Sequence, residues 1–188
     1  MAIDAFQREF RLTQDGKRRA RIAESLGQWY LADGQLLLAK EMFSASQLAG
    51  NASANFLRAF ASLLARLGDH EEADARYRIL IKQAPFDREA NLYLAQRAAQ
   101  QGHPEDAIRS LEALRSASPD DSGVLESLAR SYVATRRQDK AALVWGKLAD
   151  MTGALRYTAH YANALFDAGN YQEALREYRK LMQSGAAD

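Results

Sequence analysis

The side chains best suited to chemistry in this sequence are few, and their spacing does not bring them together. The histidines are His70, His103 and His160, and none has a histidine, cysteine or glutamate three or four residues further along. Zinc sites place such ligands one helical turn apart, and the chain has no cysteine to supply a thiolate. We therefore expect no metal site.

Motifs for phosphate binding and covalent catalysis are also missing. There is no GxGxxG sequence, no phosphate-binding loop and no GxSxG elbow. The carboxylate pairs Glu71–Glu72 and Asp120–Asp121 fall at expected helix starts or turns, where negative charge offsets the helix dipole. We therefore predict that the chain is not an enzyme and uses no cofactor.

Composition favours an all-α protein. The 188 residues are 47% hydrophobic and 26% charged, with only 3 prolines, and are rich in helix-forming Ala, Leu, Arg, Glu and Gln. Lys and Arg number 25 against 24 acidic residues, and this net charge of +1 creates no field that would attract phosphate backbones. Nucleic acid is therefore not an expected partner.

The sequence shows no membrane or export signal. Its apolar stretches are shorter than the roughly 18 residues that a membrane helix needs, so we expect no direct membrane insertion. Asp4, Arg8 and Glu9 lie where a signal peptide would need an apolar block. The compartment stays open between cytoplasm and periplasm, because a piece of a longer exported protein would look the same.

A repeat of 34 residues is the main signal in the chain. Ala39, Ala73, Ala107 and Ala141 follow one another at this spacing, and Ala174 comes after 33 residues. A fixed period of this length indicates an array of similar supersecondary units. The elements that position any functional side chain must therefore be these repeats.

Other columns keep step with these alanines. Five residues earlier stand Gly34, Gly68, Gly102 and Gly169, with Arg136 in the fourth repeat. Twelve residues before the alanine each repeat has a small residue, directly preceded by a large one: Leu26–Gly27, Phe60–Ala61, Leu94–Ala95, Leu128–Ala129 and Tyr161–Ala162. Four residues later stand Phe43, Tyr77, Leu111, Trp145 and Tyr178. A small residue beside a large one lets two helices approach closely.

Each repeat therefore predicts a helical hairpin with a first helix A and a second helix B. The glycine can take the left-handed conformation that ends helix A. Pro104 suits the first turn of a helix B, whereas Pro85 and Pro119 fall where helix B must stop.

These columns resemble the tetratricopeptide repeat family, whose 34-residue unit has a large-small pair at positions 7 and 8, Gly near 15, a small residue at 20 and Pro at 32. The resemblance implies an all-α, right-handed superhelical α-solenoid of antiparallel helix pairs. It places five repeats at 20–53, 54–87, 88–121, 122–154 and 155–188. The spacing and the near-neutral charge disfavour the 35-residue RNA-reading helical repeat.

Residues 1–19 are expected to form an N-terminal helix, read as helix B of a preceding incomplete repeat. Ala5 lies 34 residues before Ala39, and Phe6 or Phe10 would then cover Trp29. The chain stops inside a helix B without a polar capping helix, which is typical of a segment of a longer solenoid. A short natural protein with a frayed end is the alternative.

The resemblance also implies a concave groove lined by helix A, in which position 9 is Gln28, Ser62, Gln96, Arg130 and Asn163. All five side chains can form hydrogen bonds, so they suit either the backbone of a bound peptide or plain solvent. Arg58, Arg66 and Arg130 could meet carboxylates of a partner, and Leu92, Tyr93, Val133 and Phe166 offer apolar anchors. No three consecutive repeats carry the Lys, Asn and Arg set with which family members clamp chaperone tails, and Glu24 has the wrong sign for it.

The sequence therefore predicts a non-catalytic protein–protein interaction scaffold that binds a peptide or partner domain in the helix A groove. We expect it to belong to a larger bacterial assembly, with the cell envelope, secretion and polysaccharide export as candidate settings. The alternative is a structural spacer or self-assembling rod, a homo-oligomer formed through exposed terminal repeats. In that case the last helix, with Tyr171, Leu175, Tyr178 and Met182, would meet a neighbour's first repeat.

Overall fold

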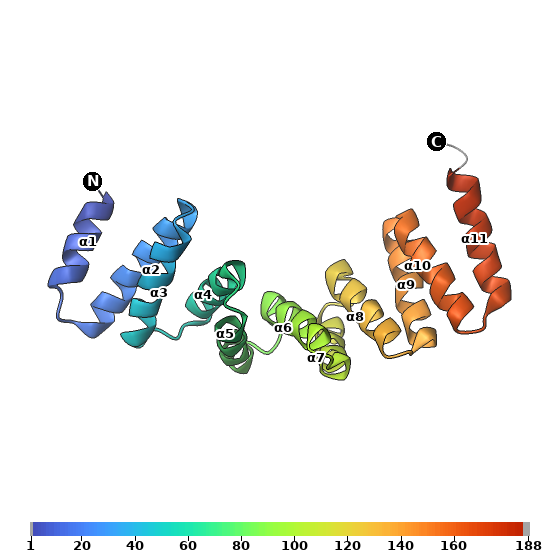
Figure 1. Cartoon of the computed structure of the whole chain (residues 1–188), viewed down its shortest axis with the longest axis horizontal. Coiled ribbons are helices and arrows are strands. Elements are labelled where there is room, and N and C mark those ends of the chain that lie inside the picture. The colour runs from blue at the N-terminus through green and yellow to red at the C-terminus, as the bar shows by residue number, and fades with distance from the viewer. Residues whose placement is uncertain (1, 186–188) are drawn as a thin grey trace. The chain divides into compact units, whose positions relative to one another are not determined.

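The computed structural model describes residues 2–185, which form eleven helices and no strand (Figure 1). The helices are α1 Ala2–Leu12, α2 Gly16–Ala32, α3 Leu36–Leu48, α4 Ala54–Leu67, α5 His70–Gln83, α6 Arg88–Gln100, α7 Pro104–Ala117, α8 Ser122–Ala134, α9 Gln138–Thr152, α10 Leu155–Asp167 and α11 Tyr171–Gly185. The chain divides into two compact units, Met1–Ala90 and Asn91–Asp188, called here the N-terminal and C-terminal units. The all-α fold class is confirmed.

Successive helices pack as hairpins within each unit. In the N-terminal unit α2 packs against α3 and α4 against α5, and α3 also contacts α4. In the C-terminal unit α8 packs against both α7 and α9, and α10 packs against both α9 and α11. Helices such as α3 and α8 thus pack against both the helix before them and the helix after them.

The turns from helix A to helix B use left-handed backbone, as the glycine column predicted. Gly34, Gly68, Gly102 and Gly169 have φ angles of 76°, 84°, 81° and 85°. Arg136 keeps the same conformation with φ 57°, the one positive value outside glycine in residues 2–185. The fourth repeat therefore makes the same turn with a side chain for which this backbone is strained.

The predicted helix ends also agree with the structure. Pro104 is the first residue of α7, and α5 and α7 each end two residues before Pro85 and Pro119. The side chain of Asp121 caps α8 by accepting hydrogen bonds from the backbone N–H groups of residues 123 and 124. Glu71 lies in the first turn of α5. The Asp121 carboxylate thus caps α8, and Glu71 lies where a negative charge offsets the helix dipole, as expected.

An aromatic cluster forms the core of the N-terminal unit. The ring centroids of Phe43, Phe56 and Phe60 lie 5.7 to 5.8 Å apart, and all three rings are fully buried. Gly27 packs directly on Phe43, where a Cβ atom would approach a ring carbon to 2.4 Å. The small residue beside a large one therefore has the packing role that the repeat predicted.

Helix α1 covers the first hairpin. The ring of Phe6 makes an edge contact with Trp29 at 4.7 Å, whereas Phe10 lies under the guanidinium of Arg19 at 4.8 Å. Of the two predicted covers for Trp29, Phe6 is the one that forms a ring contact. Helix α2 begins at Gly16, capped by Asp15, so residue 20 lies inside it. The repeat boundaries and the assignment of residues 1–19 stay predictions.

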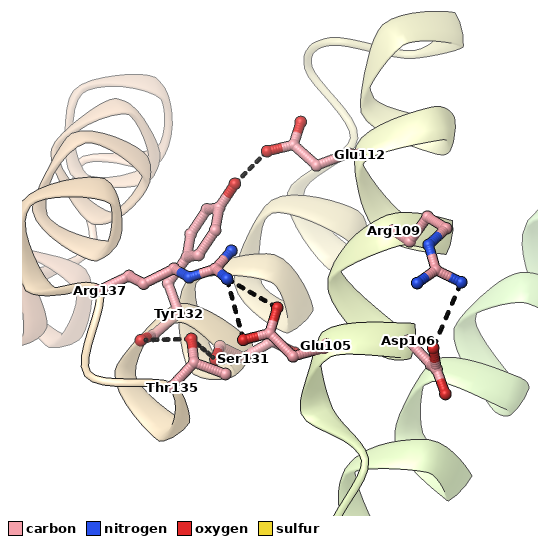
Figure 2. Close-up of polar contacts among 8 residues, drawn as sticks. All are labelled: Glu105, Asp106, Arg109, Glu112, Ser131, Tyr132, Thr135 and Arg137. Carbon is pink, nitrogen blue, oxygen red and sulfur yellow. Dashed lines mark hydrogen bonds and ion pairs between the residues drawn. The ribbon is translucent and has the colours of Figure 1, made fainter.

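Polar contacts join neighbouring repeats through residues 20 to 32 positions apart in sequence. Lys40 Nζ lies 2.7 Å from Asp69 Oδ2 in the N-terminal unit. In the C-terminal unit Arg137 Nη2 lies 2.8 Å from Glu105 Oε2, and the hydroxyl of Tyr132 donates to Glu112 (Figure 2). Burial first, and then the Glu112 carboxylate, raise the pKa of Tyr132 to about 12. The Arg137–Glu105 and Tyr132–Glu112 contacts join α7 to α8 and to the turn that follows α8.

No helix within residues 2–185 is both long enough and apolar enough to cross a membrane.

Candidate functional site

A hollow of about 580 Å³ opens between α6 and α8 in the C-terminal unit. It is lined by Leu92, Ala95, Gln96, Ala99, Leu111, Gly123, Glu126, Ser127, Arg130, Ser131 and Ala134. Three predicted groove residues, Leu92, Gln96 and Arg130, therefore lie in one place. Small residues in both helices leave the space open, because Gly123 and the alanines have little or no side chain to fill it.

The lining of this α6–α8 hollow is largely apolar. Leu92 is half-buried and Leu111 fully buried, while Gln96 is exposed and forms no hydrogen bond within residues 2–185. The hydroxyls of Ser127 and Ser131 donate to carbonyls of their own helix, at 2.9 Å each. An apolar side chain could therefore occupy the hollow, with the Gln96 amide free to bond a backbone beside it.

A polar network runs along one side of this hollow. Arg130 Nη2 donates to Glu126 Oε1 at 2.7 Å, and the Tyr157 hydroxyl donates to the other Glu126 oxygen at 2.8 Å. Arg156 in turn donates to the Tyr157 hydroxyl at 2.9 Å. The Arg130 hydrogen bond, helped by that from Tyr157, holds the pKa of Glu126 below its ordinary value against the effect of burial.

A second hollow of about 320 Å³ lies next to the first and shares Arg130 with it. This α8–α10 hollow is lined by Arg130, Val133, Gln138, Trp145, His160, Asn163, Ala164 and Asp167. The His160 ring stacks on Trp145 with centroids 4.6 Å apart and an interplanar angle of 26°. The stacked pair forms a flat aromatic wall.

Val133, predicted as an apolar anchor, also lines this hollow. Asn163 is the fifth predicted groove residue that the hollows bring together, but its oxygen is already bonded. The Tyr178 hydroxyl on α11 donates to Asn163 Oδ1 at 2.6 Å. Its amide nitrogen is left as the group available to a partner. The two other predicted residues of this unit, Tyr93 and Phe166, line neither hollow. Phe166 is 54% exposed, and its ring makes an edge contact with the Tyr171 ring, with centroids 5.2 Å apart.

The predicted groove residues of the N-terminal unit lie on α2 and α4. Gln28 and Arg66 are exposed and Ser62 is half-buried. Arg58, expected to meet a partner's carboxylate, is bound within its own chain, because Asp87 Oδ2 lies 2.6 Å from its Nη2. Asp87 also accepts from the Ala90 N–H at 2.9 Å, so Arg58 steadies the first turn of α6. We therefore assign Arg58 a structural role within the chain rather than a role in binding a partner.

Several residues of the hollows were not singled out by the sequence. Trp145 belongs to a column that predicted core packing, and it is indeed buried, yet its edge lines the α8–α10 hollow. His160 lies three residues before Asn163 on α10, a spacing that puts both on one helix face. That spacing was the available signal. Gln138 gave none, because it lies in α9 rather than in a helix A.

The hollows are lined by few of the side chains that bind metal ions. Among residues 2–185 no three His, Asp or Glu side chains are grouped so that they could hold a metal ion. Both hollows instead combine apolar walls with a few polar groups, which is the usual make-up of a site for a flexible organic ligand or a peptide segment.

Solved structures with the same fold are numerous. A fragment of MamA from Desulfovibrio magneticus, residue 41 to its end, superimposes with a TM-score of 0.73 at 19% identity, covering 90% of this chain and 96% of its own. YrrB, described as a tetratricopeptide repeat protein with an unusual peptide-binding site, gives 0.78 at 11% identity, with coverage of 96% and 92%. A tetratricopeptide repeat protein from Parabacteroides merdae gives 0.71 at 17% identity, with coverage of 97% and 72%. At these identities the likeness concerns the fold.

At the level of sequence, no curated protein matches the chain. The model of the tetratricopeptide repeat does match, over residues 58–122 and again over residues 94–153. The two matches overlap and together span residues 58–153, just over half of the 188 residues. Since the 34-residue period, the paired helices and this match agree, the chain belongs to the tetratricopeptide repeat family.

Proposed function

We propose that this chain is a non-catalytic scaffold that binds a peptide or a partner domain along its A helices, with the two hollows of the C-terminal unit as the main contact site. The family's fold suggests a protein–protein interaction scaffold, and such scaffolds are generally not catalytic. A near-neutral net charge of +1 supports a protein partner over nucleic acid.

One observation carries this proposal. Five side chains singled out for the groove come from three successive A helices and line two hollows that share Arg130: Leu92, Gln96, Arg130, Val133 and Asn163. A segment lying across α6, α8 and α10 could place one side chain in each hollow. Gln96 and Asn163 would then bond its backbone.

The experiment starts from peptides selected on the full chain. Peptides from a random display library are enriched on the immobilised protein, and the best is synthesised and titrated by calorimetry. A double variant, Gln96→Ala with Arg130→Ala, should weaken binding by about tenfold or more, since two polar contacts are lost. Circular dichroism should show an unchanged fold, because the Arg130 side chain is 64% exposed and Gln96 is exposed as well.

Arg109→Ala is the matched control. Arg109 forms a similar exposed ion pair, at 3.3 Å from Asp106, but lies on α7 outside both hollows (Figure 2). Its removal should leave the affinity unchanged. Equal effects of the control and the double variant, or none from either, would contradict the groove proposal.

The alternative, a self-assembling rod or spacer, is favoured by a different observation. On α11 the side chains of Tyr171, Leu175 and Met182 are 62%, 50% and 75% exposed. Such an apolar stripe suits contact with another helix. Light scattering at rising concentration should then show mass growth that Leu175→Glu abolishes, and a strict monomer would exclude this alternative.

We also propose a larger bacterial assembly as the setting, with the cell envelope, secretion and polysaccharide export as candidates. The Ala-, Leu- and Arg-rich sequence supports this setting only in general terms. Affinity purification of the intact protein from its own cells, with the Gln96→Ala/Arg130→Ala variant as comparison, would identify the assembly through partners that the variant loses.

A further inference from the structure

The α8–α10 hollow contains a buried acceptor whose hydrogen-bonding capacity is unused. Gln138 lines the hollow, and its Oε1 is buried without a hydrogen-bond donor within residues 2–185. A buried amide oxygen without a donor costs about 1 to 3 kcal/mol, so such an atom calls for an explanation. Because this oxygen is closed to solvent, a donor of a ligand reaches it after the Gln138 side chain turns toward the hollow.

The same hollow has a solvent-exposed carboxylate without an ion-pair partner within residues 2–185. Asp167, the last residue of α10, lines it and forms no ion pair within residues 2–185. Arg130 is the cation on the opposite lining, and Glu126 already lies 2.7 Å from its guanidinium. Asp167 is therefore left as the charge that the hollow offers to a ligand.

The walls suit a long aliphatic stem. The stacked rings of Trp145 and His160 form one flat side, and Val133 lies in the lining as well. The volume of 320 Å³ is near the lower limit for small-molecule pockets, about 300 Å³, and so fits one long side chain rather than a folded element. Lysine and arginine lay their methylene chains along apolar surfaces while their charged ends donate hydrogen bonds.

We infer that the α8–α10 hollow binds a lysine or arginine side chain of the partner segment, whose charged end pairs with Asp167 and, once the Gln138 side chain turns toward it, donates to Gln138 Oε1. This inference rests on the proposed function, because the basic residue arrives as part of a segment held by the A helices. It adds the class of side chain that this part of the groove selects.

The test uses the peptides selected on the full chain. Their sequences should share a basic residue at one position, and a second selection on Asp167→Asn should lose that preference. In calorimetry, replacing this residue by norleucine, which keeps the stem and removes the charge, should weaken binding to the wild type by about three- to tenfold. The same replacement should change binding to Asp167→Asn by much less.

A charge swap sharpens the test. A peptide with glutamate at that position should bind the wild type poorly and recover on Asp167→Lys, since the two reversals restore opposite charges. Asp139→Asn is the control: it changes the charge equally, one residue from Gln138, but Asp139 does not line the hollow. This control should keep the preference for a basic residue.

The outcomes separate the two proposals. Peptides that respond to Gln96→Ala/Arg130→Ala but share no basic residue would overturn this inference and leave the groove proposal standing. The same holds if norleucine weakens binding to the wild type and to Asp167→Asn equally. Peptides that ignore the groove variant, or no selected peptide at all, would overturn both.

Discussion

At the scale of single residues, Arg136 shows the repeat pattern acting against side-chain preference. Its φ of 57° belongs to the conformation that the other four A-to-B turns give to glycine. A side chain with a Cβ costs roughly 1 to 2 kcal/mol there, whereas glycine costs about 0.5 to 1 kcal/mol through the greater freedom of the unfolded chain. The difference favours glycine modestly.

We predict that Arg136→Gly raises the free energy of unfolding by about 0.5 to 1 kcal/mol, because it removes the strain of the left-handed turn. Urea unfolding followed by circular dichroism measures the change. Gly102→Ala, at the equivalent turn with φ 81°, should lower stability by a similar amount. Destabilisation by Arg136→Gly would mean that the arginine side chain outweighs the strain.

A second prediction concerns pH and the Glu126 carboxylate. Its pKa is held below the ordinary 4.5, chiefly by the Arg130 hydrogen bond. The ionised form is favoured in the folded state, so this stabilisation is present above the unfolded pKa and is lost as pH falls through the folded pKa. The stability difference between wild type and Glu126→Gln should therefore be constant near neutral pH and shrink below about pH 4.5.

A variant of Arg130, which donates the main hydrogen bond to Glu126, checks that prediction. Arg130→Gln removes the main cause of the shift, so unfolding measured across pH should show a weaker acid dependence than in the wild type. An identical acid dependence in wild type and both variants would show that Glu126 does not contribute.

At the scale of helices, the sequence predicted the hairpins because their determinants are local and recur. Glycine in the A-to-B turn, proline after helix B and a large-small pair each act within a few residues. The 34-residue period repeats the glycine in four repeats, the proline in two and the large-small pair in all five. The start of α2 at Gly16 was missed, because the Asp15 cap lies before the first periodic residue.

The candidate site was less predictable, since it depends on which polar groups bind each other across helices. Arg58 with Asp87, and Asn163 with Tyr178, are 29 and 15 residues apart. The period marks the groove positions but does not show which are already bonded. Trp145 and Gln138 were missed for a related reason, as they reach the hollow from a helix B.

Helix packing makes Gly27 a sensitive position. A Cβ there would meet the Phe43 ring at 2.4 Å, so we predict that Gly27→Ala lowers the free energy of unfolding by about 1 to 3 kcal/mol through overpacking. Gly16→Ala, at the start of the same helix with no atom within 4 Å, should be neutral or slightly stabilising. Urea unfolding compares the two, and equal effects would contradict the packing argument.

At the scale of the whole chain, the stability of a repeat array is the sum of the stability of each repeat and of the contacts between neighbouring repeats. The effect of a local change should therefore fade along the array. The two tryptophans report on different units, with Trp29 in α2 and Trp145 in α9. Local differences in unfolding can therefore be observed in one molecule.

We predict that Gly27→Ala lowers the urea midpoint seen by Trp29 more than that seen by Trp145. The measurement uses Trp145→Phe and Trp29→Phe backgrounds, so that each fluorescence signal comes from one ring. The reason is that Gly27 contacts its own hairpin, and each repeat contacts mainly its neighbours. Equal shifts in both backgrounds would show that the chain unfolds as one cooperative body.

The turn that contains Arg136 has a further consequence, for proteolysis. Among the five A-to-B turns, that between α8 and α9 alone contains basic residues, Arg136 and Arg137. Glu105 forms an ion pair with the Arg137 side chain, whereas Arg136 is exposed. The backbone strain at Arg136 is relieved when this residue leaves its left-handed conformation. A trypsin-like protease should therefore cut first after Arg136, separating α8 from α9 and thus opening the helix pair next to the α8–α10 hollow.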